Sequence, residues 1–224
     1  MNYSVLNLFM KFFSRALMLL LVLPVINYAK GVVARKQGDD TAEAAGRLTL
    51  NPIAHLDILG SLMIMLCGFG WSKPMPINYN RMRNTKKGII LVALTGPVTL
   101  FIMSIICRNV ALVVLNMISG VAGMAIGFIF SMLASISVCI GVIHLLPLPG
   151  MDGFTLLYYL TGNKFASWYH RNQRAVDQYS FYILIGLFFI GTLTGGHIDP
   201  LGWIIGIFDW ILNWTTVWGN FVFT

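Results

Sequence analysis

The stretch GIILVALTGPVTLFIMSIIC, at residues 88–107, decides the class of fold. It carries no charged residue, and its 20 residues match the length that a helix needs to cross the hydrocarbon core of a bilayer. Similar apolar runs at residues 121–146 and about 179–194 predict two further spans. Because helices satisfy their own backbone hydrogen bonds in lipid, the sequence predicts an all-α integral membrane protein.

The composition excludes a soluble globular protein. Of the 224 residues, 57% are hydrophobic and 10% are charged, and the mean hydropathy is +0.77. Average soluble domains carry roughly 25% charged residues. The net charge of +7 comes from 15 Lys and Arg against 8 Asp and Glu. These residues lie in short loops between apolar runs, which is typical of topology signals in membrane proteins and does not indicate a nucleic-acid partner.

Three weaker segments set the expected number of spans. Residues 16–29 and 58–70 are predicted to cross, although each reaches full length by continuing into polar positions. The Trp-rich tail at residues 201–214 is either a sixth span or an interfacial helix. The first segment is similar to a signal peptide, but no small-residue cleavage site follows it, so we expect a retained span. We therefore predict five or six transmembrane helices in a single domain, residues 1–224.

Lys and Arg in the loops indicate the side of the membrane on which the N-terminus lies. If residues 58–70 cross, loops 30–47 and 73–87 fall on opposite sides. Ten Lys and Arg then lie on the side of the N-terminus and five on the other side. Because positively charged loops stay in the cytoplasm, this count predicts a cytoplasmic N-terminus.

Several residues that are costly in lipid mark candidate functional positions. The ionisable residues at expected membrane depth are Lys30, His55, Asp57, Arg108, His144, Asp152 and Asp209. We expect Arg108 to snorkel to the interface and Asp209 to face water. Cys67, Cys107 and Cys139 lie in apolar stretches without a CxxC pair, so they are expected to be buried free thiols.

The segment at residues 38–60 is expected to be a folded loop outside the membrane. Asp39 and Asp40 suit a turn after the first helix, and Asn51 followed by proline marks a second turn. Residues 48–50 alternate in the manner of a short strand.

Four motifs give the sequence a specific resemblance. They are GRLTLNPIAHLDILG at residues 46–60, GWSKPMPINYNRMRN at 70–84, ALTGP at 93–97 and LLPLPGMDG at 145–153. In this order and at this spacing they resemble the signatures of the site-2 protease family of intramembrane zinc metalloproteases. The resemblance covers residues 26–157. It implies a site-2 protease-like core, substrates that are transmembrane segments, and a place in the bacterial cell membrane.

The family's zinc site is altered in this sequence. In the family, an HExxH helix supplies two zinc-binding His residues and a Glu that activates water, and a later Asp is the third ligand. Here Ile26 and Lys30 occupy the two His positions, Asn27 occupies that of the general base, and Asp152 in the MDG motif is retained. Ile26 has no donor atom, the ammonium of Lys30 repels a cation, and Asn27 cannot take a proton from water. We therefore expect no catalytic residue and no cofactor.

Two alternatives remain for Asp152. His55 and His144 are acceptable zinc ligands, and with Asp152 they would form a displaced zinc site. Two prolines and a glycine separate His144 from Asp152, so no single helical face presents both. In the other hypothesis, Lys30 and Asp152 meet inside the bundle, and an ion pair replaces the metal. The competing expectation is that Lys30 snorkels to the surface while Asp152 is protonated or caps a helix.

Five residues are candidates for a substrate groove: Gly96, Pro97, Pro147, Pro149 and Gly150. The Gly-Pro pair interrupts the backbone ladder within a span and permits close helix approach. The LPLPG segment is irregular backbone at membrane depth, which is tolerated where it is buried or lines a cavity. It either pairs with an extended substrate segment or simply turns the chain between two helices. The loop at residues 70–84 is a gate or a proline-stiffened anchor, and we favour the anchor.

These observations lead to two functions of different class. In the first, the protein is a catalytically inactive pseudoprotease that retains a scaffold for binding membrane segments. Its partners would be the bilayer and transmembrane segments of other membrane proteins. In the second, it is an active zinc-dependent intramembrane metalloprotease that uses displaced ligands. A decayed copy without function is the third possibility.

Overall fold

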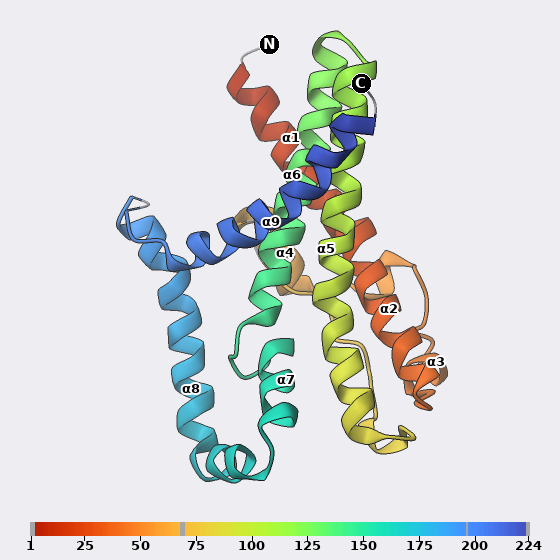
Figure 1. Ribbon diagram of the computed structural model, residues 1–224, viewed down its shortest axis with the longest axis vertical. Coiled ribbons are helices and arrows are strands. Elements are labelled where there is room, and N and C mark those ends of the chain that lie inside the picture. The colour runs from red at the N-terminus through yellow and green to blue at the C-terminus, as the bar shows by residue number, and fades with distance from the viewer. Residues whose placement is uncertain (1–2, 68–69, 196, 223–224) are drawn as a thin grey trace.

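The computed structural model describes residues 3–67, 70–195 and 197–222, and every regular element in these ranges is helical (Figure 1). The elements are α1 (Tyr3–Leu17), η1 (Met18–Val22), α2 (Leu23–Lys36), α3 (Thr41–Ala44), η2 (Pro52–Ala54), α4 (Ile58–Cys67), η3 (Tyr79–Arg81), α5 (Thr85–Met117), α6 (Gly120–Leu145), α7 (Asp152–Thr161), α8 (Asn163–Leu193) and α9 (Pro200–Val222). The all-α prediction is confirmed within these ranges. The predicted strand at residues 48–50 is wrong, because that segment is an irregular connection.

Three helical stretches in the described residues are long and apolar enough to cross a membrane. They are Val5–Lys36, Thr85–Met117 and Gly120–Leu145. The first combines α1, η1 and α2 into one rod. The π-helical turn η1 lies just before Pro24, which has no backbone N–H to donate. At the end of this turn, the backbone N–H of Leu23 donates to the carbonyl of Met18. The chain is therefore a membrane protein with at least these candidate spans.

The other expected spans have a different form. The segment at residues 58–70 contains α4, whose 10 residues extend about 15 Å, half the thickness of a hydrocarbon core. Arg15 of α1 donates to the last carbonyls of this helix, at 2.7 Å from Met65 O and 2.9 Å from Leu66 O. The segments at residues 179–194 and 201–214 lie in α8 and α9. Neither of these two helices is among the three candidate spans, so the total of five or six stays a prediction.

The core forms where α5 and α6 pack side by side as an antiparallel pair (Figure 1). A two-residue connection at residues 118–119 forces this arrangement. Gly141 of α6 faces the ring of Phe101, which would lie 2.8 Å from a Cβ at that glycine, so the small residue sets the close approach. The N-terminal rod packs against this pair, and Met18 and Val22 are fully buried there.

The turns after α2 and before α5 are in contact at one end of the molecule. Arg83 N–H donates to Gln37 O at 2.8 Å, and Asn78 N–H donates to the buried carboxylate of Asp39 at 2.7 Å. Asp39 also accepts from Thr41 N–H at 3.0 Å, which confirms its expected role in a turn. The charge count placed these two loops on opposite sides of the membrane. Since they touch, the count and the cytoplasmic N-terminus that rested on it are not supported.

Helix α9 packs against the central pair, whereas α8 stands apart from that pair (Figure 1). Arg108 of α5 forms an ion pair with Asp209 of α9, and the rings of Phe101 and Phe208 stack at 5.3 Å. The structure therefore pairs the two ionisable residues that were expected to reach the interface and water separately. Cys107 is a buried free thiol as expected, and Cys139 is free and half-buried. The side chain of Cys67 lies outside the described residues.

Candidate functional site

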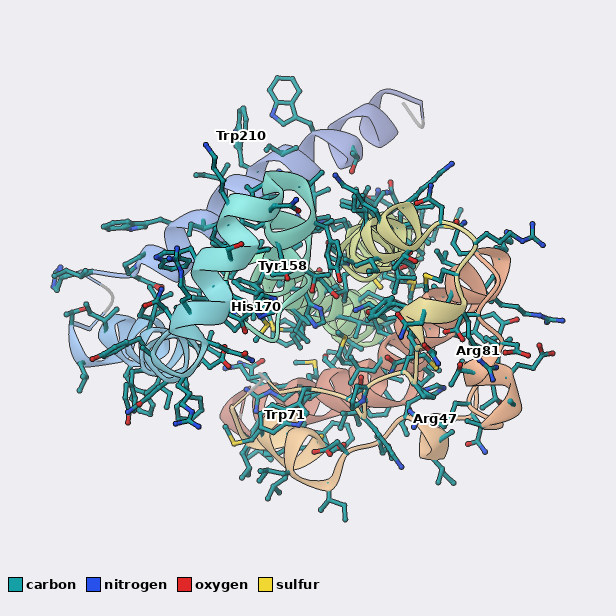
Figure 2. All side chains as sticks on the ribbon, turned by 90° about the horizontal axis from the view of Figure 1, so that it is seen from below. Arg47, Trp71, Arg81, Tyr158, His170 and Trp210 are labelled. Atoms are coloured by element: carbon teal, nitrogen blue, oxygen red, sulfur yellow. The ribbon has the colours of Figure 1, made fainter. Side chains whose placement is uncertain are left out.

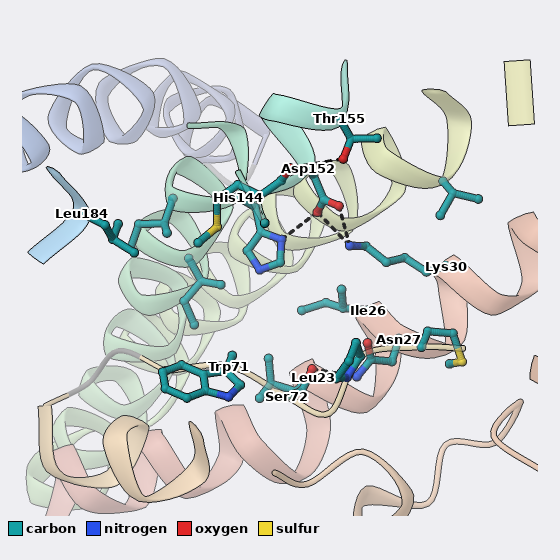
Figure 3. A pocket seen from close by; sticks show the side chains of 18 of the residues that line it. Leu23, Ile26, Asn27, Lys30, Trp71, Ser72, His144, Asp152, Thr155 and Leu184 are labelled. Atoms are coloured by element: carbon teal, nitrogen blue, oxygen red, sulfur yellow. Dashed lines mark hydrogen bonds and ion pairs between the residues drawn. The ribbon is translucent and has the colours of Figure 1, made fainter. Parts of the chain in front are cut away.

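A cavity of about 790 Å³ opens between α2, the extended segment that follows α4, the end of α6, α7 and α8. This volume falls within the range of small-ligand sites. Figure 3 shows its polar corner, where side chains from α2, α6 and α7 converge. Much of the remaining wall is apolar, and it includes Leu23, Ile26, Met63, Met75, Ile140, Ile143, Leu184, Ile185 and Phe189.

An ion pair between Lys30 and Asp152 occupies the polar corner. The ammonium nitrogen of Lys30 lies 2.9 Å from Oδ1 and 2.7 Å from Oδ2 of Asp152. The two side chains are 15% and 16% exposed, so the pair is mostly withdrawn from solvent. The predicted ion pair is therefore present, and the competing expectation of a snorkelling Lys30 is wrong.

Gly96 of α5 makes room for this pair. A Cβ at Gly96 would lie 2.6 Å from Cε of Lys30 and 2.9 Å from Oδ2 of Asp152. Any larger side chain would push the two charged groups away from α5. The Gly-Pro motif thus permits a close approach, as expected, but the group that approaches is an ion pair and not a neighbouring helix backbone.

His144 joins the pair from the last turn of α6. Its Nδ1 lies 2.7 Å from Oδ2 of Asp152. The chain folds back sharply after α6, with Gly150 at a φ of +91° and Gly153 so close to the α6 end that a Cβ would lie 2.0 Å from Leu145 O. Because two helix ends meet at this turn, the prolines and glycine that separate His144 from Asp152 in sequence bring them together in space.

The hydrogen bond to Asp152 determines which nitrogen of the His144 ring is the donor. A carboxylate accepts hydrogen bonds but cannot donate one, so Nδ1 carries the proton. Figure 3 shows the ring beside the cavity, and His144 lines the wall.

Asn27 holds the segment that forms another wall of the cavity. Its side chain is buried, and Nδ2 donates to Oγ of Ser72 at 2.9 Å. The same segment is held where Lys73 N–H donates to His55 O at 2.9 Å and where Arg47 donates to Lys73 O at 3.2 Å. These attachments favour the anchor interpretation of the loop at residues 70–84.

Tyr79 adds a polar group to the same wall. Burial raises the pKa of its phenol above the ordinary value, and the negative charges of Asp152 and Asp39 act in the same direction. The phenol therefore stays protonated at neutral pH and is a hydrogen-bond donor.

Some of the remaining candidate residues line the cavity and others do not. His55 is buried in its own loop, where Nε2 lies 2.7 Å from Thr49 O, and it does not line the cavity. Gly150 lines the cavity, whereas Pro97, Pro147 and Pro149 are not among its lining residues. Ser72, Tyr79, Thr155 and the α8 residues of the wall were missed, because nothing in their local sequence indicates which side of a helix or loop faces the cavity.

The described side chains do not fit a zinc ion. In these residues no group of three or more His, Cys, Asp and Glu is placed to hold a metal. His144 and Asp152 are two suitable donors, but a catalytic zinc needs three, and the ammonium of Lys30 sits on the carboxylate that a metal would use. The displaced set of His55, His144 and Asp152 is not assembled.

Comparison with known proteins identifies a relative of this chain. The chain is 37% identical over 134 residues to a Bacillus subtilis (strain 168) protein named "Putative zinc metalloprotease YwhC". The alignment covers 58% of this chain and 60% of the relative. No protein-family model matches the chain, and no solved structure matches it. The chain is thus related to a metalloprotease-like protein over part of its length.

Proposed function

We propose that this chain is a site-2 protease-like membrane protein that binds a segment of another membrane protein without cutting it. In this proposal residues 26–157 form the site-2 protease-like core, within five or six spans in a bacterial cell membrane. The relative's name and the four sequence motifs support the protease ancestry. The observation that carries the lack of cleavage is the Lys30–Asp152 ion pair, which takes the carboxylate that a metal would need.

Each altered position has a structural role that is incompatible with hydrolysis. Ile26 is buried in the core cluster and offers no donor atom. The amide of Asn27 is a hydrogen-bond donor to Ser72, and an amide cannot act as a general base at neutral pH. Lys30 supplies a positive charge where zinc would add two more. In this proposal the site therefore lacks both the ligand set for the metal and the base of the family mechanism.

The cavity suits an extended segment of a few residues. A spanning helix about 30 Å long and 10–12 Å wide occupies a few thousand Å³, which exceeds the 790 Å³ available. An unwound segment exposes backbone N–H and C=O groups, and the ring of His144 in the cavity wall offers one of them a hydrogen-bonding partner. Apolar side chains of the segment would pack against Ile140 and Leu184. The cavity would thus bind a membrane segment whose helix is interrupted.

An active zinc-dependent intramembrane metalloprotease is the second candidate function. The name of the relative favours it, as does the contact between His144 and Asp152, which brings two possible ligands together. It requires Lys30 to leave Asp152 and a third ligand to enter. Zinc would supply a Lewis acid and an activated water in that case.

Zinc content separates the two candidates. The purified protein and Asp152→Ala are equilibrated with trace zinc, dialysed and measured by elemental analysis, and we expect far less than one equivalent in both. A third variant, I26H/N27E/K30H, restores the HExxH sequence and should bind one equivalent, because Asp152 already lies beside position 30. One equivalent in the parent that is lost in Asp152→Ala would contradict the proposal and favour the active protease.

Crosslinking tests the binding of membrane segments. A photoreactive residue at position 184 lines the cavity, whereas one at position 183 is exposed on the same helix and does not line it. We expect position 184 to crosslink a co-reconstituted peptide with a glycine- and proline-interrupted apolar segment, and an uninterrupted poly-Leu helix to crosslink less. Equal yields at both positions would show that the peptide meets α8 from the lipid and not from the cavity.

A further inference from the structure

The Lys and Arg residues are distributed unevenly along the long axis of the molecule. Figure 1 places the α2–α3 turn, the start of α5 and the α7–α8 turn at one end, and the N-terminus and the α5–α6 turn at the other. We call the first the basic end. Its nine cations are Arg35, Lys36, Arg81, Arg83, Lys86, Lys87, Lys164, Arg171 and Arg174.

Most of these cations have no acidic partner. Asp40 pairs with Arg81 and Glu43 pairs with Arg35. Asp39 is buried and accepts backbone N–H groups, and Asp177 accepts from the phenol of Tyr169. Among the residues that the structure describes, seven exposed cations of this end make no ion pair: Lys36, Arg83, Lys86, Lys87, Lys164, Arg171 and Arg174.

Aromatic side chains flank the cations where α7 leads into α8. The hydroxyl of Tyr158 lies 2.9 Å from Nε2 of His170, and Trp168 is 46% exposed. Figure 2 looks onto this end and shows Tyr158 and His170 together, with Arg81 across the same face. Trp and Tyr beside Lys and Arg are typical of the headgroup layer of a bilayer.

The opposite end has few free charges. Arg15 is engaged with the carbonyls at the end of α4, and Arg108 is paired with Asp209. Lys11 is exposed on α1, and no ion pair is recorded for it in the described part of the chain. The difference between the two ends is therefore larger than the sequence count indicated, because the fold gathers loops that the count had separated.

We propose that the basic end lies at the cytoplasmic surface and docks onto anionic phospholipid headgroups of that leaflet. Lys and Arg donate to phosphate oxygens, and the seven exposed cations supply a positive surface that an anionic leaflet attracts. The contact between the turns at residues 37–40 and 78–83 requires both to lie on this side. The N-terminus and the α5–α6 turn are then outside, which reverses the orientation expected from the sequence.

Cysteine accessibility tests the orientation. Ala44→Cys, Ser119→Cys and Ser167→Cys are small changes at exposed positions on the α3 loop, the α5–α6 turn and early α8. With a membrane-impermeant maleimide, we expect intact cells or spheroplasts to label Ser119→Cys alone, and permeabilised cells to label all three. The parent, whose Cys107 is buried, gives the background. Labelling of Ala44→Cys or Ser167→Cys in intact cells, or failure of Ser119→Cys to label there, overturns the proposal.

Lipid titration tests the docking surface. Short-chain phosphatidylglycerol or phosphatidylcholine is titrated into detergent-solubilised protein, and the binding is followed by native mass spectrometry. We expect Lys86→Gln to weaken phosphatidylglycerol binding about fivefold and Lys86→Gln/Lys87→Gln to weaken it further, while Lys11→Gln, the matched change at the opposite end, has no effect. Equal affinity for the two lipids in the parent, or equal losses in Lys86→Gln and Lys11→Gln, overturns the docking surface.

Discussion

From the burial of the Lys30–Asp152 ion pair we predict how much free energy of unfolding is lost when either charge is removed. Replacing Asp152 with Asn leaves the Lys30 ammonium 15% exposed with no countercharge. Removing one partner of a buried pair costs about 3–5 kcal/mol, and the remaining exposure favours the lower end of that range. Lys30→Met should cost less, about 2 kcal/mol, because His144 still donates to the carboxylate. The double variant removes both charges, so we expect it to be no worse than the milder single change.

Thermal unfolding in detergent measures these losses. Cys107 is buried and free, so a thiol-reactive dye reports on unfolding. For a chain of this size, about 3 kcal/mol corresponds to a fall of roughly 6–12 °C in the midpoint. Glu43→Gln is the control, because its pair with Arg35 is about half exposed and such pairs contribute about 0.5 kcal/mol. The two single changes should couple by about 3 kcal/mol, because the double variant should lose no more than the milder single change.

Additive losses in the double variant would refute the reasoning. They would show that each side chain contributes independently and that the short contacts of the pair carry no mutual stabilisation. A double variant that is less stable than Asp152→Asn would be equally contrary, because removing an uncompensated ammonium should relieve the structure. Unchanged stability in all three would place both groups in solvent, against their burial.

Two further predictions concern the surroundings of the pair. Gly96→Ala places a methyl group 2.6 Å from Cε of Lys30 and should lower the free energy of unfolding by about 1–3 kcal/mol. The control is Gly186→Ala, whose methyl group meets nothing within 4 Å, and it should be neutral or stabilising. Equal unfolding midpoints for the two variants would contradict the close approach at Gly96. Asn27→Ala removes the hydrogen bond to Ser72 and should lower the free energy of unfolding by about 1 kcal/mol. It should also accelerate amide hydrogen exchange in residues 70–78. Unchanged exchange in these residues would mean that the segment is held by its other attachments.

The sequence predicts the long apolar helices well because their signal is local. The run at residues 88–107 is uncharged over 20 residues, and it lies within α5. The expected crossing at residues 58–70 depends instead on how far a helix continues. Hydropathy does not show that α4 ends after 10 residues and that Arg15 satisfies its final carbonyls. The expected orientation depended on the same crossing, since the side assigned to a neighbouring loop reverses if that segment does not cross.

Some residues of the candidate site were predictable from the sequence and others were not. Lys30 and Asp152 are 122 residues apart, and the family resemblance placed them together because it carries information about the fold. The sequence argument did not place His144 beside Asp152, because the prolines between them were expected to end the helix. That expectation holds, but a tight turn between two helix ends can bring residues eight apart into contact. The wall contributed by α8 depends on tertiary packing alone, and no local pattern predicts it.

The contacts of Asn27 and Lys30, which the proposal places at positions of an HExxH motif, bear on whether the proposed site has simply decayed. Without Lys30, Asp152 would keep the hydrogen bond from His144 but would have no countercharge in a mostly apolar cavity, at a cost of about 2 kcal/mol. Lys30 removes that cost, and it fits because position 96 has no side chain. Asn27 finds a partner in Ser72 on the facing segment. A site under no constraint would be expected to leave buried charges unpaired or to fill its cavity, whereas here Lys30, Asp152 and Asn27 are paired and the cavity of about 790 Å³ is open. These features favour a retained binding site over a decayed copy.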